Sequence, residues 1–314
     1  MNRFNLEMGN EDKLNKKENM NKRKNDKYNR ILIKNKQILD DTLPSNPPMV
    51  SIVILNRNGA MFLNDFFNSF KENTIYKNYE IIIVDNGSTD KSISILRSES
   101  NILPLQIIRN KENKNFSQGC NQGAKHAKGD YILLINNDTQ PTYGWLNEMV
   151  KCALRTSKAG AICPKILYPN NNKKNKALLV QQIGMTFKKD GKLFKPQFVG
   201  DGYKPYDDRV NKEEGRLAVS AAVLLVKKHI YFEVGGLDEN YNYGYEDVDF
   251  SLELSKRGYV NMYCPTALIF HHLWGTQKKV DWDVILKRRE KNIKIFHNKW
   301  AKWLKENINI ESLG

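Results

Sequence analysis

The sequence predicts an α/β fold in which helices flank a mostly parallel, open central sheet. Apolar residues make up 40% of the 314-residue chain, which is enough for a sizeable core. Between residues 49 and 276, short apolar runs suited to buried strands alternate with segments of helical periodicity. Strand, helix and strand follow one another at the spacing of parallel strands joined by crossover helices.

Strands and helices can be assigned in chain order. The expected strands in the first half of this region are Val50–Leu55, Tyr79–Val84, Leu105–Ile108 and Tyr131–Ile135. The helices expected between them are Met61–Phe70, Asp90–Arg97 and Gln118–Lys128. The first helix has one apolar face, formed by Phe62, Phe66, Phe67 and Phe70. The second begins with an aspartate suited to the N-cap position. Further along the chain, Ala267–His272 predicts a strand that ends in two histidines.

The two ends of the chain differ in composition from this region. Residues 1–48 are basic, rich in Asn and Lys, and end in a Pro-rich linker, so we predict a disordered extension. An AT-biased genome would also explain the composition. Residues 1–48 and 277–306 carry net charges of +4 and +6, which together are two thirds of the total of +15. Nucleic acid, anionic lipid and solubility alone are the alternative explanations for such basic flanks.

A basic amphipathic helix is predicted for residues 277–314. Its apolar residues recur near helical spacing among lysines and arginines, and they are Trp282, Ile285, Ile293, Phe296, Trp300, Trp303 and Leu304. Such a helix either lies on an anionic membrane surface or packs its apolar side on the preceding domain. The sequence leaves both alternatives open.

Several classes of protein are disfavoured. No run of 18 or more apolar residues is present and the N-terminus has no apolar signal segment, so neither a membrane span nor secretion is expected. The four cysteines have no CxxC spacing, which disfavours a disulfide framework and a zinc site and favours a reducing cytoplasm. No GxGxxG follows the first strand and no P-loop motif occurs, which disfavours a dinucleotide-binding fold and a P-loop NTPase.

Polar residues directly follow three of the predicted strands. The three clusters are Asn56-Arg57-Asn58-Gly59, Asp85-Asn86-Gly87-Ser88 and Asn136-Asn137-Asp138. Ligands of open parallel sheets bind beyond the carboxyl ends of the strands, where these side chains would line one crevice. For each cluster taken alone, turn formation and helix capping are the alternative explanation. The three together favour a binding site.

Six segments carry a resemblance to a known family. They are residues 50–58 (VSIVILNRN), 81–90 (IIIVDNGSTD), 115–123 (NFSQGCNQG), 130–139 (DYILLINNDT), 235–250 (GGLDENYNYGYEDVDF) and 269–276 (IFHHLWGT). In this order they resemble the motifs of family-2 glycosyltransferases with a GT-A fold, particularly the rhamnosyltransferase-like branch. The resemblance implies that residues 49–276 form the catalytic domain.

The resemblance implies a site for a divalent cation, Mn²⁺ or Mg²⁺, which stabilises the charge of a leaving diphosphate. Asp138 is at the position of the family's metal-binding aspartate. His271 and His272 compete for the role of an imidazole ligand, and His271 fits the family's spacing better. Asn136 replaces the first carboxylate of the family's DxD motif, which implies weaker metal binding.

A nucleotide-sugar site is implied as well. Asp85 would accept a hydrogen bond from the imide N–H of uracil or thymine, with Asn56 and Arg57 beside the base. Arg57 departs from the family's usual aromatic residue, although a guanidinium group can also stack on a base. The other residues implied for the donor site are Asn115, Gly119, Asn121, Asn136 and Asn137. The segment from Gly119 to Gly123 resembles a loop that closes on the donor. A helix N-terminus packed tightly on the sheet is the alternative.

Catalysis is implied for the adjacent pair Glu246 and Asp247, which resembles the family's ED motif at the start of a helix. Asp247 would be the general base and Glu246 would position the acceptor, whereas Asp249 is expected to be structural. Placement at a helix N-terminus is expected to lower the pKa of these carboxylates and keep them ionised. Arg216–Val226 resembles the acceptor-side strand of the family, with Ala221 where glycine is usual.

The implied activity is transfer of a sugar, with inversion, from a UDP- or dTDP-sugar to a saccharide or lipid-linked acceptor in cell-surface glycan synthesis. The expected location is the cytoplasm, with the inner face of the cell membrane as an alternative if the tail binds lipid. One rival hypothesis is a catalytically inactive GT-A-like binding module of a glycan-assembly complex. Another is a nucleic-acid-binding protein that uses its basic flanks, although the core has no aromatic-basic recognition motif for it.

Overall fold

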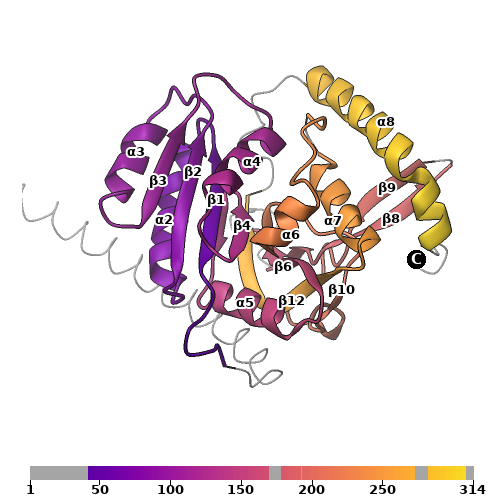
Figure 1. Cartoon of the computed structure of the whole chain (residues 1–314), viewed down its shortest axis with the longest axis horizontal. Coiled ribbons are helices and arrows are strands. Elements are labelled where there is room, and N and C mark those ends of the chain that lie inside the picture. The colour runs from indigo at the N-terminus through magenta and orange to yellow at the C-terminus, as the bar shows by residue number, and fades with distance from the viewer. Residues whose placement is uncertain (1–41, 170–177, 192, 243, 273–281, 309–314) are drawn as a thin grey trace, which may run out of the picture. The chain divides into compact units, whose positions relative to one another are not determined.

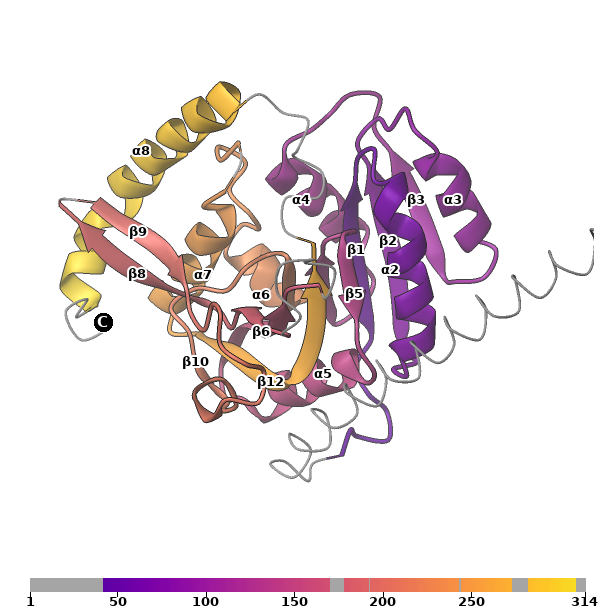
Figure 2. The ribbon, with the colours of Figure 1, turned by 180° about the vertical axis from the view of Figure 1, so that it is seen from behind.

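A computed structural model describes residues 42–169, 178–191, 193–242, 244–272 and 282–308, with side chains described from residue 286 onward in the last range. Figures 1 and 2 show this part of the chain from opposite sides. The predicted extension up to residue 41 and the predicted tail beyond residue 308 lie outside the described residues.

One large sheet has the strand order β10-β12-β6-β11-β4-β1-β2-β3, with β5 and β7 pairing beside it. Its parallel half consists of β1 (Val50–Asn56), β2 (Tyr79–Asp85), β3 (Leu105–Arg109) and β4 (Tyr131–Ile135). Strand β1 pairs in parallel with β2 and β4, and β2 pairs in parallel with β3. The four strands predicted from the apolar runs are confirmed, with ends that differ by at most one residue.

Helices cover both faces of this half of the sheet, as predicted for strands that are apolar throughout. They are α2 (Ala60–Asn73), α3 (Ser92–Glu99) and α4 (Phe116–His126). Ile52 and Ile54 of β1 pack in one core cluster with the phenylalanines of α2, whereas Leu55 faces Gly119 of α4. Figure 1 shows α2 and α3 on one side of the sheet and α4 on the other.

One detail of these helices differs from the prediction. Asp90 is not the N-cap of α3, because Lys91 occupies that position. The Asp90 carboxylate instead accepts hydrogen bonds from the backbone N–H of Ser92 at 2.9 Å and of Ala60 at 3.0 Å. It therefore ties the start of α2 to the start of α3.

The other half of the sheet is mixed. Its long strands are β6 (Ala159–Leu167), β11 (Val223–Lys227) and β12 (Val260–His271). Strand β11 runs antiparallel to both β4 and β6, and β12 runs parallel to β6. The prediction of a strand over Arg216–Val226 was wrong for its first seven residues, because regular pairing begins only at Val223. β12 begins well before the predicted Ala267.

The remaining elements surround this half. They are β5 (Thr139–Pro141), α5 (Trp145–Arg155), β7 (Val180–Gln182), β8 (Met185–Asp190), β9 (Leu193–Phe198), η1 (Asp208–Val210), β10 (Glu214–Gly215), α6 (Lys228–Glu233), α7 (Glu246–Lys256) and α8 (Trp282–Asn307). Strands β8 and β9 form a separate antiparallel hairpin. Figures 1 and 2 both show α8 lying beside this hairpin and α7.

The C-terminal helix packs its apolar side on the domain. Phe296, Trp300 and Leu304 are buried at 0–1% exposure, in one cluster with side chains of the β8–β9 hairpin and of α7. The Trp300 indole N–H donates to Asp249 Oδ1 at 2.6 Å, and Lys299 Nζ lies 2.9 Å from Asp249 Oδ2. Of the two alternatives for the tail, the structure shows packing on the domain. Asp249 is structural, as expected.

Within the described ranges, no helix combines the length and the apolar content that crossing a bilayer requires. The side chains of Trp282 and Ile285, which belong to the predicted apolar stripe, lie outside the described side chains.

Candidate functional site

The three polar clusters meet where β1, β2 and β4 end. Asn56, at the end of β1, donates from Nδ2 to Asp85 Oδ1 of β2 at 2.9 Å. Its Oδ1 accepts a hydrogen bond from Asn137 Nδ2, just beyond β4, at 2.7 Å. All three side chains are at most 5% exposed. The parallel pairing of the strands thus brings together residues that are 81 positions apart, as the pattern of strand ends predicts.

Asp85 is fully buried and holds the turn that follows β2. Its carboxylate accepts hydrogen bonds from the Ser88 backbone N–H at 3.0 Å and from the Ser88 hydroxyl at 2.5 Å, besides the bond from Asn56. A pocket of about 430 Å³ beside this turn is lined by Gly87, Ser88, Thr89, Arg109, Asn110 and Lys111. A base in that pocket would touch the turn rather than Asp85 itself. Arg57, the residue that follows Asn56, is exposed.

The segment from Asn115 to Gly123 forms a packed helix start. Asn115 and Gln118 make a reciprocal capping box at the N-terminus of α4. A Cβ atom on Gly119 would lie 2.3 Å from Leu55 Cδ1, and one on Gly123 would lie 2.4 Å from Val53 Cγ1. These glycines let α4 approach β1 closely, which matches the packing alternative for this segment. Contact of Gly119 with a donor stays a prediction.

Asn121 ties α4 to the loop that precedes α7. Its Nδ2 donates to Leu237 O at 2.8 Å and to Glu239 Oε1 at 2.9 Å, and its Oδ1 accepts from Tyr231 Oη and Leu237 N. Asn115 adds a bond from its Nδ2 to Glu239 O at 2.8 Å. The hydrogen-bonding capacity of Asn121 is therefore filled by protein atoms. In this structure it positions the loop that leads to Glu246.

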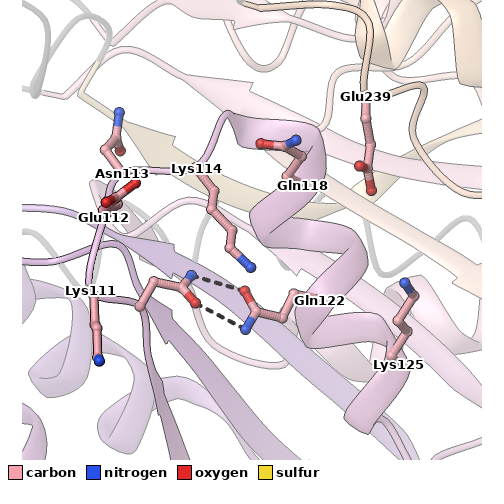
Figure 3. Close-up of a pocket in the computed structure, with 9 residues that line it drawn as sticks. Lys111, Glu112, Asn113, Lys114, Gln118, Gln122, Lys125 and Glu239 are labelled. Atoms are coloured by element: carbon pink, nitrogen blue, oxygen red, sulfur yellow. Dashed lines mark hydrogen bonds between the residues drawn. The ribbon is translucent and has the colours of Figure 1, made fainter.

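A second pocket, of about 690 Å³, lies on the outer face of α4 (Figure 3). Its lining consists of Asn110, Lys111, Glu112, Asn113, Lys114, Gln118, Gln122, Lys125 and Glu239. Two hydrogen bonds of 2.9 and 3.0 Å join the amides of Asn110 and Gln122 across its floor. None of the residues implied for metal binding or catalysis lines this pocket.

Asp138 and His271 come together through strand pairing. Strand β5 begins directly after Asp138 and runs antiparallel to β12, where Thr139 is the partner of His271. His271 Nε2 lies 3.4 Å from Asp138 Oδ1 and 3.5 Å from Asn136 Nδ2. His271 and Asp138 are 8% and 7% exposed. The His272 ring lies against Phe62, with centroids 5.8 Å apart, and its backbone N–H donates to Asp138 O at 2.9 Å.

The residues at this point fit a divalent cation. An imidazole nitrogen and a carboxylate oxygen are ligand types that Mn²⁺ accepts, and Mg²⁺ accepts the oxygen. Because such ions bind ligands at about 2.1 Å, two ligand atoms of one ion lie no more than about 4 Å apart. The separation of 3.4 Å between His271 Nε2 and Asp138 Oδ1 meets this condition. Asp138 and His271 would hold the ion, with Asn136 beside them.

Glu246 and Asp247 lie in the first turn of α7, as the ED resemblance implies. Asp247 Oδ2 accepts the Ala221 backbone N–H at 3.2 Å, and its Oδ1 accepts the Val248 N–H at 2.9 Å. Glu246 is 8% exposed, and its Oε2 has no hydrogen-bond partner among the described residues. A buried oxygen without a partner costs free energy unless a ligand completes it.

The expectation that these two carboxylates have lowered pKa values was wrong. Burial raises the pKa of Glu246 to about 8, and the nearby charge of Asp247 adds to this shift. Burial also raises the pKa of Asp247, against the hydrogen bonds from Ala221 and Val248. Desolvation outweighs the helix dipole here because the carboxylates are packed inside the domain. A base with a raised pKa is stronger at neutral pH than an ordinary aspartate.

We expect Glu246 to make stability depend on pH. Its pKa is near 4.5 when unfolded and about 8 when folded, so its contribution is complete below about pH 4.5 and is lost as pH rises toward 8. Glu246→Gln removes the ionisation. The stability of the variant relative to the wild type should rise across this window by up to about 1.4 kcal/mol per pH unit. Urea denaturation of both proteins at pH 5 and pH 8 measures the difference, and parallel pH profiles would contradict the raised pKa.

A short backbone segment links the two clusters. The Ala221 N–H donates to Asp247. The carbonyl of the following residue, Ala222, accepts the Asn136 N–H at 2.9 Å. Asn136 is two residues before Asp138 in the chain. One dipeptide at the end of β4 therefore binds both the implied base and a residue next to the implied metal ligands.

Sequence reasoning missed two groups. Gln181 is fully buried and contacts both the ring and the backbone carbonyl of His271, 90 positions later in the chain. No motif surrounds it, so no local signal could have identified it. Cys152 and Cys264 come together with Glu213, with ligand atoms within 4.8 Å of one another, although the cysteine spacing disfavoured a metal site. Both Glu213 oxygens are already paired with the Arg155 guanidinium group.

Comparison with known proteins points to one family. The family model of glycosyl transferase family 2 matches residues 51–214, more than half of the chain. An uncharacterized protein of Sinorhizobium fredii, y4gI, is 29% identical over 229 residues, which are 72% of this chain and 24% of that protein. The O-antigen biosynthesis protein RfbC of Myxococcus xanthus is 25% identical over 72% of this chain and 17% of its own length. The chain thus spans a quarter or less of these two relatives.

A third relative is closer in length to this chain. The N-acetylglucosaminyl-diphospho-decaprenol L-rhamnosyltransferase of Mycobacterium tuberculosis is 25% identical over 61% of this chain and 66% of that enzyme.

Two solved structures have a similar fold. GalNAc-T7 with UDP, GalNAc and Mn²⁺ superposes with a TM-score of 0.58 at 16% identity, over 85% of this chain and 59% of that one. The mannosyltransferase PcManGT from Pyrobaculum calidifontis with GDP-Man and Mn²⁺ gives 0.53 at 14% identity, over 82% of this chain and 67% of that one. The predicted fold class is confirmed. The chain belongs to glycosyl transferase family 2 and has its GT-A-type fold.

Proposed function

We propose that the chain is an inverting glycosyltransferase that uses a UDP- or dTDP-sugar as donor. The transferred group is a hexose or deoxyhexose, and the acceptor is a saccharide or a lipid-linked saccharide of cell-surface glycan synthesis. The metal-binding residues are Asp138 and His271, and the reaction takes place between them and α7. Asp247 acts as the general base and Glu246 positions the acceptor.

One observation carries this proposal. The dipeptide Ala221-Ala222 binds Asp247 through its first N–H and binds Asn136, next to the Asp138 and His271 pair, through its second carbonyl. A base on one side of the anomeric carbon and a charge-stabilising group on the other is the arrangement that inversion requires. A divalent cation bound by Asp138 and His271 would stabilise the negative charge of the leaving diphosphate.

The chemistry of the side chains agrees with these roles. Glu246 Oε2, buried and without a protein partner among the described residues, is suited to an acceptor hydroxyl. Asp247, with its pKa raised by burial, is suited to accept the proton of that hydroxyl as it attacks. A nucleotide-sugar donor is supported by the two solved structures with a similar fold, which hold UDP and GDP-Man.

A lipid-linked acceptor is supported by the relative from Mycobacterium tuberculosis, whose name specifies a diphospho-decaprenol substrate. Such an acceptor lies at a membrane surface, so the proposed location is the cytoplasmic face of the cell membrane. The exposed lysines of α8, among them Lys302 at 88% exposure of its side chain, would favour an anionic surface. The buried Trp300 would take no part in that contact.

A screen of nucleotide sugars tests the proposal. At 100-fold excess over its dissociation constant, the correct donor with Mn²⁺ should stabilise the protein by about 2.7 kcal/mol, which raises Tm by roughly 5–10 °C. UDP-, dTDP- and GDP-sugars are compared by differential scanning fluorimetry. EDTA should remove the shift, and so should Asp138→Ala.

Asp65→Ala, at an exposed aspartate of α2, is the matched control and should keep the full shift. If no nucleotide sugar shifts Tm, the proposed activity fails. If the shift persists in EDTA and in Asp138→Ala, the activity can stand, but the metal-dependent mechanism is refuted. A shift with GDP-sugars alone would overturn the assignment of UDP or dTDP.

A further inference from the structure

A buried glutamine holds His271 by two contacts. Gln181 lies on β7 at 0% exposure. Its Nε2 donates to the His271 backbone carbonyl at 3.1 Å, and its Oε1 lies 2.8 Å from His271 Nδ1. The backbone of β7 is itself held by antiparallel pairing with β6. The side chain therefore bridges two strands that are each fixed in the sheet.

These two contacts determine which ring nitrogen of His271 carries a proton. A backbone carbonyl can only accept a hydrogen bond, so the Gln181 NH₂ group must face it. The amide oxygen of Gln181 then faces His271 Nδ1. Because an amide oxygen also only accepts, Nδ1 must be the protonated nitrogen. In the neutral ring, the lone pair is consequently on Nε2.

Nε2 is the atom that faces the implied metal ligand. It lies 3.4 Å from Asp138 Oδ1. In the other tautomer, Nε2 would carry the hydrogen and donate it to Asp138. That bond would close the space between the two side chains and occupy the lone pairs that a cation needs. The contact with Gln181 disfavours this closed arrangement. In that tautomer His271 Nδ1 would be an acceptor, so Gln181 Oε1 would face a second acceptor inside the protein.

We propose that Gln181 is a positioning residue of the cation site. It selects the tautomer and the ring orientation in which His271 presents the Nε2 lone pair beside Asp138. The proposal rests on the proposed function, in which Asp138 and His271 bind a divalent cation. In metal sites generally, an acceptor for the second ring N–H of a ligating histidine is worth about 10–100-fold in metal affinity.

The neighbouring residue provides a matched control. Gln182 has the same side chain, is 2% exposed, and points to the opposite face of β7 because side chains alternate along a strand. Gln181→Leu removes both contacts to His271 at similar volume, and Gln182→Leu makes the same chemical change next to it. Gln181→Glu keeps an oxygen facing Nδ1 and, when protonated, a donor facing the carbonyl.

The first measurement is the tautomer of His271 in the metal-free protein, read from ¹⁵N shifts of the ring at pH 8. The wild type and Gln182→Leu should show Nδ1–H, whereas Gln181→Leu should show a mixture or Nε2–H. The second measurement is the dissociation constant of Mn²⁺ alone, from the electron paramagnetic resonance signal of free Mn²⁺. Gln181→Leu should weaken binding about 10–100-fold, while Gln182→Leu and Gln181→Glu should stay within about 3-fold of the wild type.

The outcomes separate this proposal from the function on which it rests. If the wild type binds no Mn²⁺, both the assignment of Asp138 and His271 as metal ligands and the proposed role of Gln181 are refuted. If the wild type binds Mn²⁺ and Gln181→Leu binds it equally well, only the role of Gln181 falls. A wild-type Nε2–H tautomer also overturns it, whatever the metal affinity. If circular dichroism shows that Gln181→Leu does not fold, the Mn²⁺ affinity of Gln181→Glu decides instead. A loss of affinity of more than about 10-fold in that variant contradicts the proposal.

Discussion

Replacing Asp247 with Asn is expected to lower the rate of sugar transfer by roughly 10²–10⁴-fold, while donor affinity changes by only a few-fold. The substitution keeps the size and polarity of the side chain but removes its ability to accept a proton. One amide oxygen remains to accept a backbone N–H from Ala221 or Val248, so the fold of the segment should persist. Single-turnover rates and donor binding, measured with the sugar nucleotide identified by the thermal screen, separate the two effects.

Asp249→Asn is the control on the same helix. The Asp249 carboxylate is 2% exposed and is engaged by Trp300, Lys299 and Tyr241. The Asp249→Asn variant should therefore have a lower free energy of unfolding, while its rate of sugar transfer per folded molecule changes little. If Asp247→Asn instead weakens donor binding as much as it slows transfer, Asp247 is a structural cap of α7 and its assignment as the base must be withdrawn.

Trp300→Ala is expected to destabilise the protein by roughly 3–5 kcal/mol, the usual cost of emptying the space of a buried tryptophan. In a domain of this size, that corresponds to a fall in Tm of roughly 6–20 °C. The change also removes the indole N–H that donates to Asp249.

Lys302→Ala tests whether the effect is specific to the buried face. The Lys302 side chain is 88% exposed, so this variant should stay within about 0.5 kcal/mol of the wild type. Co-sedimentation with anionic vesicles completes the experiment. Trp300 is 1% exposed and cannot reach a bilayer while α8 is packed, so vesicle binding, if present, should not follow Trp300. A Trp300→Ala protein that melts like the wild type but no longer sediments with vesicles would show that the helix binds membranes instead.

The parallel half of the sheet was predictable because its signal is local. A run such as Ile81–Val84 is apolar at every position, and such a run is stable mainly when it is buried on both faces. The polar residues after β1, β2 and β4 were predictable as one group for the same reason, since the ends of adjacent parallel strands share an edge. The resemblance to the ED motif correctly predicted that α7 starts at Glu246. It did not predict that the pKa values of Glu246 and Asp247 are raised. Burial of Glu246 depends on what packs over it, and this overrides the helix dipole.

The mixed half of the sheet was harder to predict because antiparallel pairs join residues far apart in sequence. The β5–β12 pairing brings Asp138 to His271, and β7 brings Gln181 to the same ring. Cys152 and Cys264 meet because α5 packs on β12. None of these contacts leaves a periodic pattern along the chain.

By itself, the sequence determined the α/β class, the four parallel strands, the polar edge where they end and the family whose motifs it shares. The tertiary structure alone decided which of two adjacent histidines faces Asp138, which glutamine contacts its ring, and that the C-terminal helix packs on the domain. The physical reason is the range of the interactions involved. Strands and helix starts depend on neighbours a few residues away, whereas ring orientation, burial and the choice between core and membrane depend on side chains that only folding brings into contact.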